Sequence, residues 1–493
     1  MISTKRIFFL ILGPLIFLVL QSLDTPDGMP ESAFDMLSIT LWMAVWWVSE
    51  VIPIGVTALL PIILFPLTGA VDITTTTASF GHKYIFLYMG GFILAIAIEK
   101  WNLHKRIALH IIKIIGTNVS KIILGFMVAT AFLSMWISNT ATSVMMLPIG
   151  MSIVTQLKDN PLTEKNENII FGKALMLAIA YSASIGGVAT LIGTPPNLVF
   201  AGFIEEAYNI EISFANWIKF GLPISIILLI VAWYYLTHFA FTFKQKEFPG
   251  GKAEIDRLLK DLGPIKMEEK MVLIVFVLTA FCWITRSFLL QQLVPGIDDT
   301  IIAITAGILL FILPSKNKGE PIINWKEAVK MPWGIILLFG GGMALASGFE
   351  ITGLATWLGS QVQLLEGLTL FVLLLVIIAS VNFITEVTSN LATTAMLLPI
   401  LAPVAISLEV NPYMLMVATT VAASCAFMLP VATPPNAVVF GSGYLRISDM
   451  IKTGFWMNLI SIIILSFAVY ILLPLLWDFD PKSFKDFIEL SAK

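Results

Sequence analysis

The chain has 493 residues, of which 58% are hydrophobic and 12% are charged, and its mean hydropathy is +0.91. Soluble proteins carry about 25% charged residues, so this composition excludes a large soluble core and predicts an all-α protein that crosses a membrane many times. The formal net charge of −3 says little, because the distribution of charge across the membrane matters more. The two cysteines lie in apolar segments, so they predict neither a disulfide framework nor a metal cluster.

Apolar runs follow one another from the first residues onward. Lys5 and Arg6 precede the first run, and because no small-residue cleavage site follows it, we expect a retained first helix. A bilayer is spanned by roughly 20 apolar residues. We predict 11 spans, starting from a cytoplasmic N-terminus, at 7–23, 34–49, 52–68, 84–99, 174–203, 217–242, 271–291, 300–314, 333–350, 413–441 and 455–477.

Two re-entrant helical hairpins, near 122–157 and 369–408, complete the predicted topology. On this layout 23 of the 29 Lys and Arg residues lie on the cytoplasmic side, as the positive-inside rule requires. We expect a multi-pass protein of the bacterial inner (cell) membrane, in contact with lipid and with no nucleic-acid partner. The predicted parts are an N-terminal helix (1–33), a first repeat (34–243), a basic cytoplasmic linker (244–270), a second repeat (271–477) and a C-terminal tail (478–493).

The repeat is visible as one short motif that occurs twice. Residues 138–149 read SNTATSVMMLPI, residues 389–400 read SNLATTAMLLPI, and eight of the twelve positions are identical. Each copy is a patch of small hydrogen-bonding residues between long apolar runs. A duplicated polar patch in a membrane chain indicates a transporter whose site lies at the repeat interface.

The two repeats are predicted to have opposite orientations in the membrane. The offset of 251 residues also aligns Glu99 with Glu350, and a connecting arm follows each glutamate. The first arm, 100–121, contains five Lys and Arg residues, whereas the second arm, 351–372, contains none. Aligned segments of opposite charge character belong on opposite faces, so one hairpin should enter from the cytoplasm and the other from outside.

A second pair of motifs interrupts the fifth and tenth predicted spans. Residues 193–197 read GTPPN and residues 432–436 read ATPPN. Consecutive prolines remove amide donors and disfavour helix for the residue before them, so each helix should break at its threonine and resume at the first proline. Non-helical backbone at membrane depth is tolerated only where protein buries it or a cavity hydrates it.

These breaks and polar patches together predict a binding site. Freed carbonyls and Ser, Thr and Asn oxygens are hard neutral donors that suit an alkali cation, while half-helix N-termini suit a carboxylate. Because neither motif contains Arg or Lys, a bound anion would depend on co-bound cations for its largest positive charges. An enzyme would need a nucleophile, base or metal set, and a channel a continuous polar lining; the sequence indicates neither.

At these residues the chain resembles the divalent anion–sodium symporter family. The resemblance covers nearly the whole chain and includes the segments 46–53 (WWVSEVIP) and 57–61 (TALLP). It implies two inverted repeats, a scaffold domain and a transport domain that moves as an elevator, a homodimer, and co-transported Na⁺ without an organic cofactor.

The resemblance also implies which residues form the site. The first sodium site would use Ser134, Ser138, Asn139 and the carbonyl of Gly193, and the second would use Thr385, Thr388, Asn390 and the carbonyl of Ala432. The substrate-binding residues would be Ser138, Asn139, Thr140, Thr194, Pro195, Ser389, Asn390, Leu391, Thr433 and Pro434.

Two residues raise particular questions. Leu391 stands where many bacterial members have threonine, and it offers no donor to a substrate carboxylate, so substrate preference stays open. Glu386 pairs with Met135 in the repeat, so its charge is not a duplicated requirement, and we favour a structural hydrogen-bonding role over one in anion binding or proton transfer.

The leading hypothesis is sodium-driven uptake of C4-dicarboxylates such as succinate, malate and fumarate. Three alternatives use the same fold: a sodium-independent exchanger of dicarboxylate against 2-oxoglutarate, a citrate transporter and a sulfate transporter. The residues do not discriminate among them.

Overall fold

The computed structural model describes residues 4–116, 118–158, 165–243, 251–316, 319–361, 367–483 and Phe487. Within these ranges the regular structure is helical and contains no strand. Residues 244–250 of the predicted linker, and 484–493 of the predicted tail apart from Phe487, lie outside the described residues.

The helices of the first half are α1 (Thr4–Gln21), α2 (Glu31–Ser49), α3 (Ile54–Thr57), α4 (Leu60–Thr68), α5 (Ile73–Ala78), η1 (Ser79–Gly81), α6 (Lys83–Lys100), α7 (Leu103–Ile115), α8 (Val119–Ser134), α9 (Asn139–Lys158), α10 (Lys165–Val188), α11 (Pro195–Tyr208), α12 (Phe214–Tyr234) and η2 (Tyr235–Ala240).

The remaining helices are α13 (Gly251–Asp261), α14 (Met267–Thr285), η3 (Arg286–Leu290), α15 (Gln291–Leu293), α16 (Asp299–Ile312), α17 (Trp325–Ala328), α18 (Trp333–Ile351), α19 (Leu354–Ser360), α20 (Leu370–Ile384), α21 (Asn390–Ser407), α22 (Pro412–Ala423), α23 (Pro434–Phe440), α24 (Ile447–Phe467), η5 (Ala468–Leu472) and α25 (Leu473–Trp477).

In the described part of the chain, eight helical segments are long and apolar enough to cross a membrane. Shorter apolar helices, such as α16 and α22, accompany them. Each predicted span overlaps one or more helices, so the prediction of an all-helical, multi-pass membrane protein is confirmed. The number of crossings and the boundaries of the parts stay predictions.

Two helical hairpins and two broken helices occupy the positions of the repeated motifs. α8 and α9 flank a non-helical tip at residues 135–138, and α20 and α21 flank a second tip at 385–389. The helix that follows each hairpin is interrupted, between α10 and α11 and again between α22 and α23. Both resumptions begin at proline, Pro195 and Pro434, because proline lacks an amide hydrogen and its φ angle already suits a first helical turn.

The hairpins and the broken helices are interleaved. α10 packs against α8 and α9, and α22 packs against α20 and α21. Beyond the breaks the pairing crosses over, because α11 packs against α21 while α23 packs against α9. We call α8–α12 and α20–α24 the site-bearing helices.

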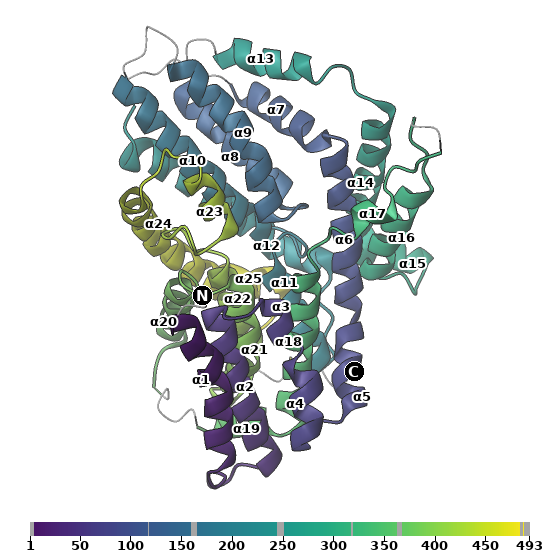
Figure 1. Ribbon diagram of the computed structural model, residues 1–493, viewed down its shortest axis with the longest axis vertical. Helices are drawn as coiled ribbons and strands as arrows, with labels where there is room; N and C mark the ends of the chain where they lie inside the picture. Colours follow the sequence, from purple (N-terminus) through teal and green to yellow (C-terminus); the bar gives the residue numbers. More distant parts are fainter. Residues whose placement is uncertain are drawn as a thin grey trace.

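Other helices lie beside this group, and we call α1, α2, α6, α14, α16 and α18 the flanking helices. α6 packs along α16, and α14 contacts both of them. α13 lies at one end of the long axis of the molecule, across α7 and α9, and the α1–α2 connection lies at the other end (Figure 1).

Candidate functional site

The first hairpin tip places three oxygen-bearing groups around Asn139, the first residue of α9. The hydroxyl of Ser134, the last residue of α8, lies 2.7 Å from the Ala183 carbonyl oxygen of α10. The Asn139 amide can be placed in two orientations, and only the second satisfies both its oxygen and its nitrogen. In one, the Ser134 hydroxyl donates to Asn139 Oδ1 at 2.6 Å. In the other, Asn139 Nδ2 lies 2.6 Å from Ser134 Oγ, 3.1 Å from the Ala183 oxygen and 3.3 Å from the Gly193 oxygen.

These distances describe a small cage of oxygen atoms. With Asn139 Oδ1 turned inward, the Ser134 hydroxyl is its one donor, because the Ala183 and Gly193 groups are carbonyl acceptors. A set of neutral oxygen atoms of this kind has the chemistry of an alkali-cation site. With Nδ2 turned inward, the amide donates to the same carbonyl groups, so the Asn139 side chain fills the centre of the cage.

The second hairpin tip repeats this geometry. The Thr385 hydroxyl lies 2.6 Å from Asn390 Oδ1 and 3.1 Å from the Ala423 carbonyl oxygen of α22. Thr385 and Asn390 stand 251 residues after Ser134 and Asn139, and they make the corresponding contacts. The pair of a hydroxyl group and an asparagine is therefore repeated in three dimensions as well as in sequence.

Glycine lets the first break approach its tip closely. A Cβ atom at Gly187 would lie 2.5 Å from Asn139 Oδ1, and a Cβ at Gly193 would lie 2.5 Å from the Gly187 carbonyl oxygen. Both distances are shorter than any van der Waals contact allows. Any other residue at Gly187 would displace the Asn139 side chain, and any other residue at Gly193 would force apart the two sides of the break.

The asparagine that ends each Thr-Pro-Pro-Asn motif stabilises the break beside it, a role that the sequence alone did not predict. Asn197 Nδ2 donates to the carbonyl oxygens of Gly187, at 3.2 Å, and Thr190, at 2.8 Å. Asn436 Nδ2 donates to the aligned carbonyls of Ala426, at 3.3 Å, and Leu429, at 3.0 Å. The signal was present in the sequence, because both Thr-Pro-Pro motifs end in asparagine.

Glu386 has a structural partner set around the second break. Its carboxylate accepts from the backbone amides of Phe427, Met428 and Leu429 at 2.8, 2.9 and 3.0 Å. Asn458 Nδ2 of α24 donates to the same carboxylate at 2.7 Å. These four bonds agree with the structural role favoured from the sequence, since they occupy both carboxylate oxygens.

The remaining predicted site residues lie in different surroundings. Ser138 Oγ accepts from the Ala141 amide at 3.3 Å, at the start of α9. Thr388 bonds within its own hairpin, to the Ile384 carbonyl at 2.9 Å and to the Thr393 hydroxyl at 2.7 Å. Ser138, Asn139, Pro195, Ser389 and Asn390 are half-buried, Thr194, Thr388, Leu391, Ala432 and Thr433 are buried, and Thr140 and Pro434 are exposed.

The two cages differ in whether a carbonyl group of the broken helix lies close to the asparagine. The Gly193 carbonyl is within 3.3 Å of Asn139 in one amide orientation. Among the described residues, no hydrogen bond joins Ala432 to Asn390; the Ala432 amide instead donates to the Leu429 carbonyl at 3.2 Å. The structure therefore assembles the first predicted cation set more fully than the second.

The two hairpins also differ in exposure at aligned positions. Thr140, Val144 and Pro148 form an exposed stripe along α9, with Val144 51% exposed. The aligned residues of α21, at 391, 395 and 399, are buried, and Leu391 is only 5% exposed. The face of the first hairpin is open, and the face of the second is packed against α11, α18 and α2.

A cavity of about 540 Å³ continues the open stripe toward α13. Val144 and Pro148 of α9 form one wall, and residues of α7 and α13 form the others. Lys105 contributes a positive charge to the cavity lining, and Glu99 and Asp261 contribute negative charges. His104 contributes no charge near neutral pH, because burial lowers its pKa to about 4.

Comparison with known proteins identifies the family. The family profile described as "sodium:sulfate symporter transmembrane region" matches residues 4–477. The chain belongs to this family. The match confirms the resemblance inferred from the repeated motifs.

Relatives of known function are transporters. A sodium-dependent dicarboxylate transporter, SdcS, of Staphylococcus saprophyticus is 48% identical over 471 residues, which cover 94% of this chain and 91% of the relative. The transporter of the same name from Staphylococcus aureus MRSA252 is 48% identical over 484 residues, covering 97% and 93%.

Two solved structures share the fold. Neisseria gonorrhoeae MtrF superposes with a TM-score of 0.56 at 13% identity, covering 96% of both chains. The Alcanivorax borkumensis YdaH transporter superposes with a TM-score of 0.58 at 13% identity, covering 98% of this chain and all of that one. At this level of identity the likeness extends to the fold alone.

Proposed function

We propose that this protein carries C4-dicarboxylates, such as succinate, malate and fumarate, across the cell membrane together with sodium ions. The relatives that are 48% identical bear the name of sodium-dependent dicarboxylate transporters. The single observation in the structure that carries the proposal is the cage of oxygen atoms at Ser134, Asn139, Ala183 and Gly193, which is repeated at Thr385, Asn390 and Ala423.

Each cage is proposed to bind one sodium ion. In the empty cage Asn139 Nδ2 faces the carbonyl oxygens, and sodium entry turns the amide so that Oδ1 becomes a ligand. Ser138 would add its hydroxyl to the first set, and Thr388 and the Ala432 carbonyl would join the second set after a local shift. The proposed ligands are neutral and bring no fixed negative charge. Sodium would therefore be bound reversibly, as a transported ion.

The dicarboxylate is proposed to lie between the two tips. Ser138, Asn139 and Thr140 would donate to one carboxylate, and Ser389 and Asn390 to the other. Thr194-Pro195 and Thr433-Pro434 would form the walls, with Leu391 as an apolar neighbour. Since these motifs contain no Arg or Lys, the sodium ions would supply the positive charge that makes dianion binding favourable.

Transport is proposed to follow an elevator mechanism. The two repeats would be inverted, and the site-bearing helices would move past the flanking helices of a homodimer in the bacterial inner membrane. The N-terminus and α13 would face the cytoplasm. On this orientation the open stripe of α9 and its cavity describe an inward-open state.

The family description favours a second candidate, namely sulfate. Sulfate is a compact dianion and suits half-helix N-termini as well as a carboxylate does. The buried Leu391 offers no donor to a second carboxylate, which also leaves citrate as a substrate and dicarboxylate exchange as a mode of transport.

Uptake of labelled succinate into proteoliposomes tests the proposal. We expect uptake into empty vesicles that requires an inward sodium gradient and resists a hundredfold excess of sulfate. Uptake that occurs only into dicarboxylate-loaded vesicles, independent of sodium, would instead establish an exchanger. If sulfate instead abolishes succinate uptake and is itself taken up with sodium, the protein is a sodium-coupled sulfate transporter.

A further inference from the structure

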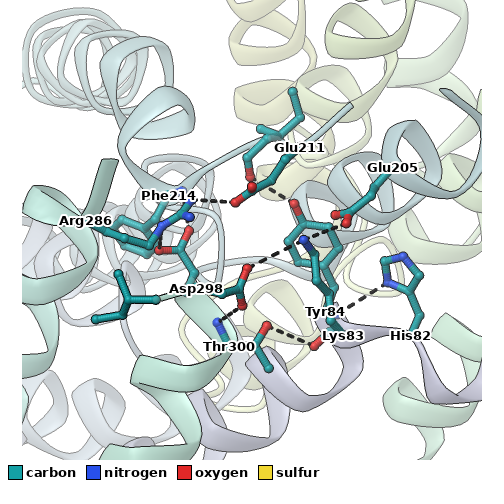
Figure 2. Close-up of polar contacts among 12 residues, drawn as sticks. His82, Lys83, Tyr84, Glu205, Glu211, Phe214, Arg286, Asp298 and Thr300 are labelled. Atoms are coloured by element: carbon teal, nitrogen blue, oxygen red, sulfur yellow. Dashed lines mark hydrogen bonds and ion pairs between the residues drawn. The ribbon is translucent and has the colours of Figure 1, made fainter. Parts of the chain in front are cut away.

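A network of charged side chains joins the site-bearing helices to the flanking helices. It lies where the α11–α12 connection meets the starts of α6 and α16 and the end of α14, and Figure 2 shows its members converging from these elements. None of these residues belongs to the proposed site. Its carboxylates come from Glu205, Glu206, Glu211, Asp298 and Asp299, and its cations from Lys83 and Arg286.

Arg286 is the centre of one half of this network. Only 2% of this residue is exposed, and its guanidinium contacts Glu211 Oε1 at 2.5 Å and Asp299 Oδ1 at 2.7 Å. The other Asp299 oxygen accepts from the Phe214 amide, the first residue of α12, at 2.8 Å. Arg286 and Asp299 belong to flanking segments, whereas Glu211 and Phe214 belong to the site-bearing side.

Lys83 forms the other half in the same way. Its ammonium group lies 2.6 Å from Glu205 of α11 and 3.5 Å from Asp298, which precedes α16. The neighbouring Tyr84 donates its hydroxyl to the Ile212 carbonyl at 3.1 Å. Lys83 and Arg286 therefore each connect the flanking helices to the site-bearing helices.

An aromatic stack continues from this network to the first hairpin tip. Trp136, between Ser134 and Ser138, stacks on Phe214 with ring centroids 5.9 Å apart, and Phe214 stacks on Trp283 of α14 at 5.1 Å. The Trp283 indole donates to the Asp299 backbone carbonyl at 3.0 Å. The rings of Phe214 and Trp283 thus connect Trp136, in the first hairpin tip, to Asp299.

Energetic arguments favour a conformational role for this network over a role in overall stability. Buried ion pairs contribute little net stability, because desolvation offsets their attraction, yet removing one partner is costly. In some proteins such pairs select one arrangement over another. Here the arrangement selected is the one in which the first hairpin tip rests against α14 and the stripe of α9 is open.

We propose that Arg286 and Asp299 form a latch that holds the first hairpin tip against α14 in the state with α9 open and α21 packed. The proposal rests on the transport function above, since the latch must release each time the site-bearing helices move. Both residues act by positioning the tip and touch neither substrate nor sodium.

Cysteine accessibility tests the latch directly. In a background with Cys282→Ala and Cys425→Ala, a reporter Ala395→Cys sits on the packed stripe of α21, where the native side chain is 2% exposed. Its rate of modification by a membrane-impermeant maleimide, in reconstituted protein without sodium, measures how often the second hairpin opens. A reporter Val144→Cys on the open stripe of α9 gives the complementary rate.

The latch variants are Asp299→Asn, which keeps an acceptor for the Phe214 amide and removes the charge, and Arg286→Gln. We expect either to raise the modification rate of the Ala395→Cys reporter by roughly fivefold or more, the lower range of typical coupling between two states. The matched control is Lys100→Gln, which breaks a 2.8 Å ion pair with Glu327 that joins α6 to α17. The control should leave the rate unchanged.

A third reporter separates latch release from unfolding. Ala178→Cys lies at the centre of α10, where the native residue is fully buried, and it should stay unmodified in every folded variant. An unchanged Ala395→Cys rate in both latch variants overturns the latch, even where wild-type protein takes up succinate with sodium. A wild-type protein that transports nothing overturns the proposed function, whatever the reporters show.

Discussion

Two asparagines occupy the centres of the two oxygen cages, at residues 139 and 390. Each is the first residue of its helix and contacts a hydroxyl group on the other arm of its helical hairpin, at 2.6 Å in both cases. An asparagine side chain presents an acceptor and a donor on one rotatable group. It can therefore fill the cage through its amide nitrogen, and its oxygen is the atom that we propose as a sodium ligand.

Replacing either asparagine by alanine should reduce sodium-driven succinate uptake to background. The change removes one proposed ligand of sodium and one proposed donor to the substrate, while the helices keep their packing. Uptake into proteoliposomes and the elution volume in size-exclusion chromatography are the measurements. Asn216→Ala, at an exposed position of α12, is the matched control and should transport normally; wild-type uptake by either cage variant would contradict the site.

Leu391 differs from its partner in the first repeat in both chemistry and exposure. It aligns with the exposed Thr140, yet only 5% of Leu391 is exposed, because other helices pack against this face of α21. Leu391→Thr should shift the selectivity among succinate, citrate and 2-oxoglutarate, because a hydroxyl group replaces an apolar wall near the second tip. Competition of each acid against labelled succinate measures the shift, and an unchanged profile would place Leu391 outside the pocket.

At the scale of elements, the broken helices depend on groups that satisfy the backbone at each break. The first break uses Asn197, and the second uses Asn436 together with Glu386. Buried amides without partners each cost about 1–3 kcal/mol. The breaks can persist at membrane depth because side chains replace the hydrogen bonds that the helix gives up.

Glu386→Gln should destabilise the second break. The glutamine amide has one acceptor oxygen in place of two, so at least one of the three backbone amides loses its partner. We expect the apparent melting temperature in detergent to fall by about 1–3 °C. Glu31→Gln, at the exposed start of α2, should leave it unchanged; a stable variant with an altered pH dependence of transport would instead assign Glu386 a role with protons.

The sequence predicted the elements that its repeats mark and missed those that depend on partners far along the chain. The Ser-Asn and Thr-Pro-Pro-Asn motifs located both hairpins and both breaks, because proline chemistry and polar patches are local signals. The crossing of α11 onto α21 and of α23 onto α9 was not predictable, since it depends on packing between the halves. The Arg286–Asp299–Phe214 network was missed for the same reason: Phe214 stands 72 residues before Arg286 and 85 before Asp299, and no motif connects them.

At the scale of the whole molecule, binding of cargo should stabilise the protein. A ligand that binds only the folded state adds about 2.7 kcal/mol at a hundred times its dissociation constant. Sodium should therefore raise the apparent melting temperature by several degrees, and sodium with succinate should raise it further. Potassium at the same ionic strength is the control, and equal effects of the two cations would argue against sodium-selective cages.

The unequal exposure of the two hairpin faces has a pharmacological consequence. A blocker supplied on the α13 side finds an open stripe along α9, whereas one supplied on the opposite side meets the packed face of α21. The onset of block from that opposite side would be limited by how fast the protein leaves this state, whatever the affinity of the compound. Two compounds of equal potency would then differ in speed according to the side on which they are applied.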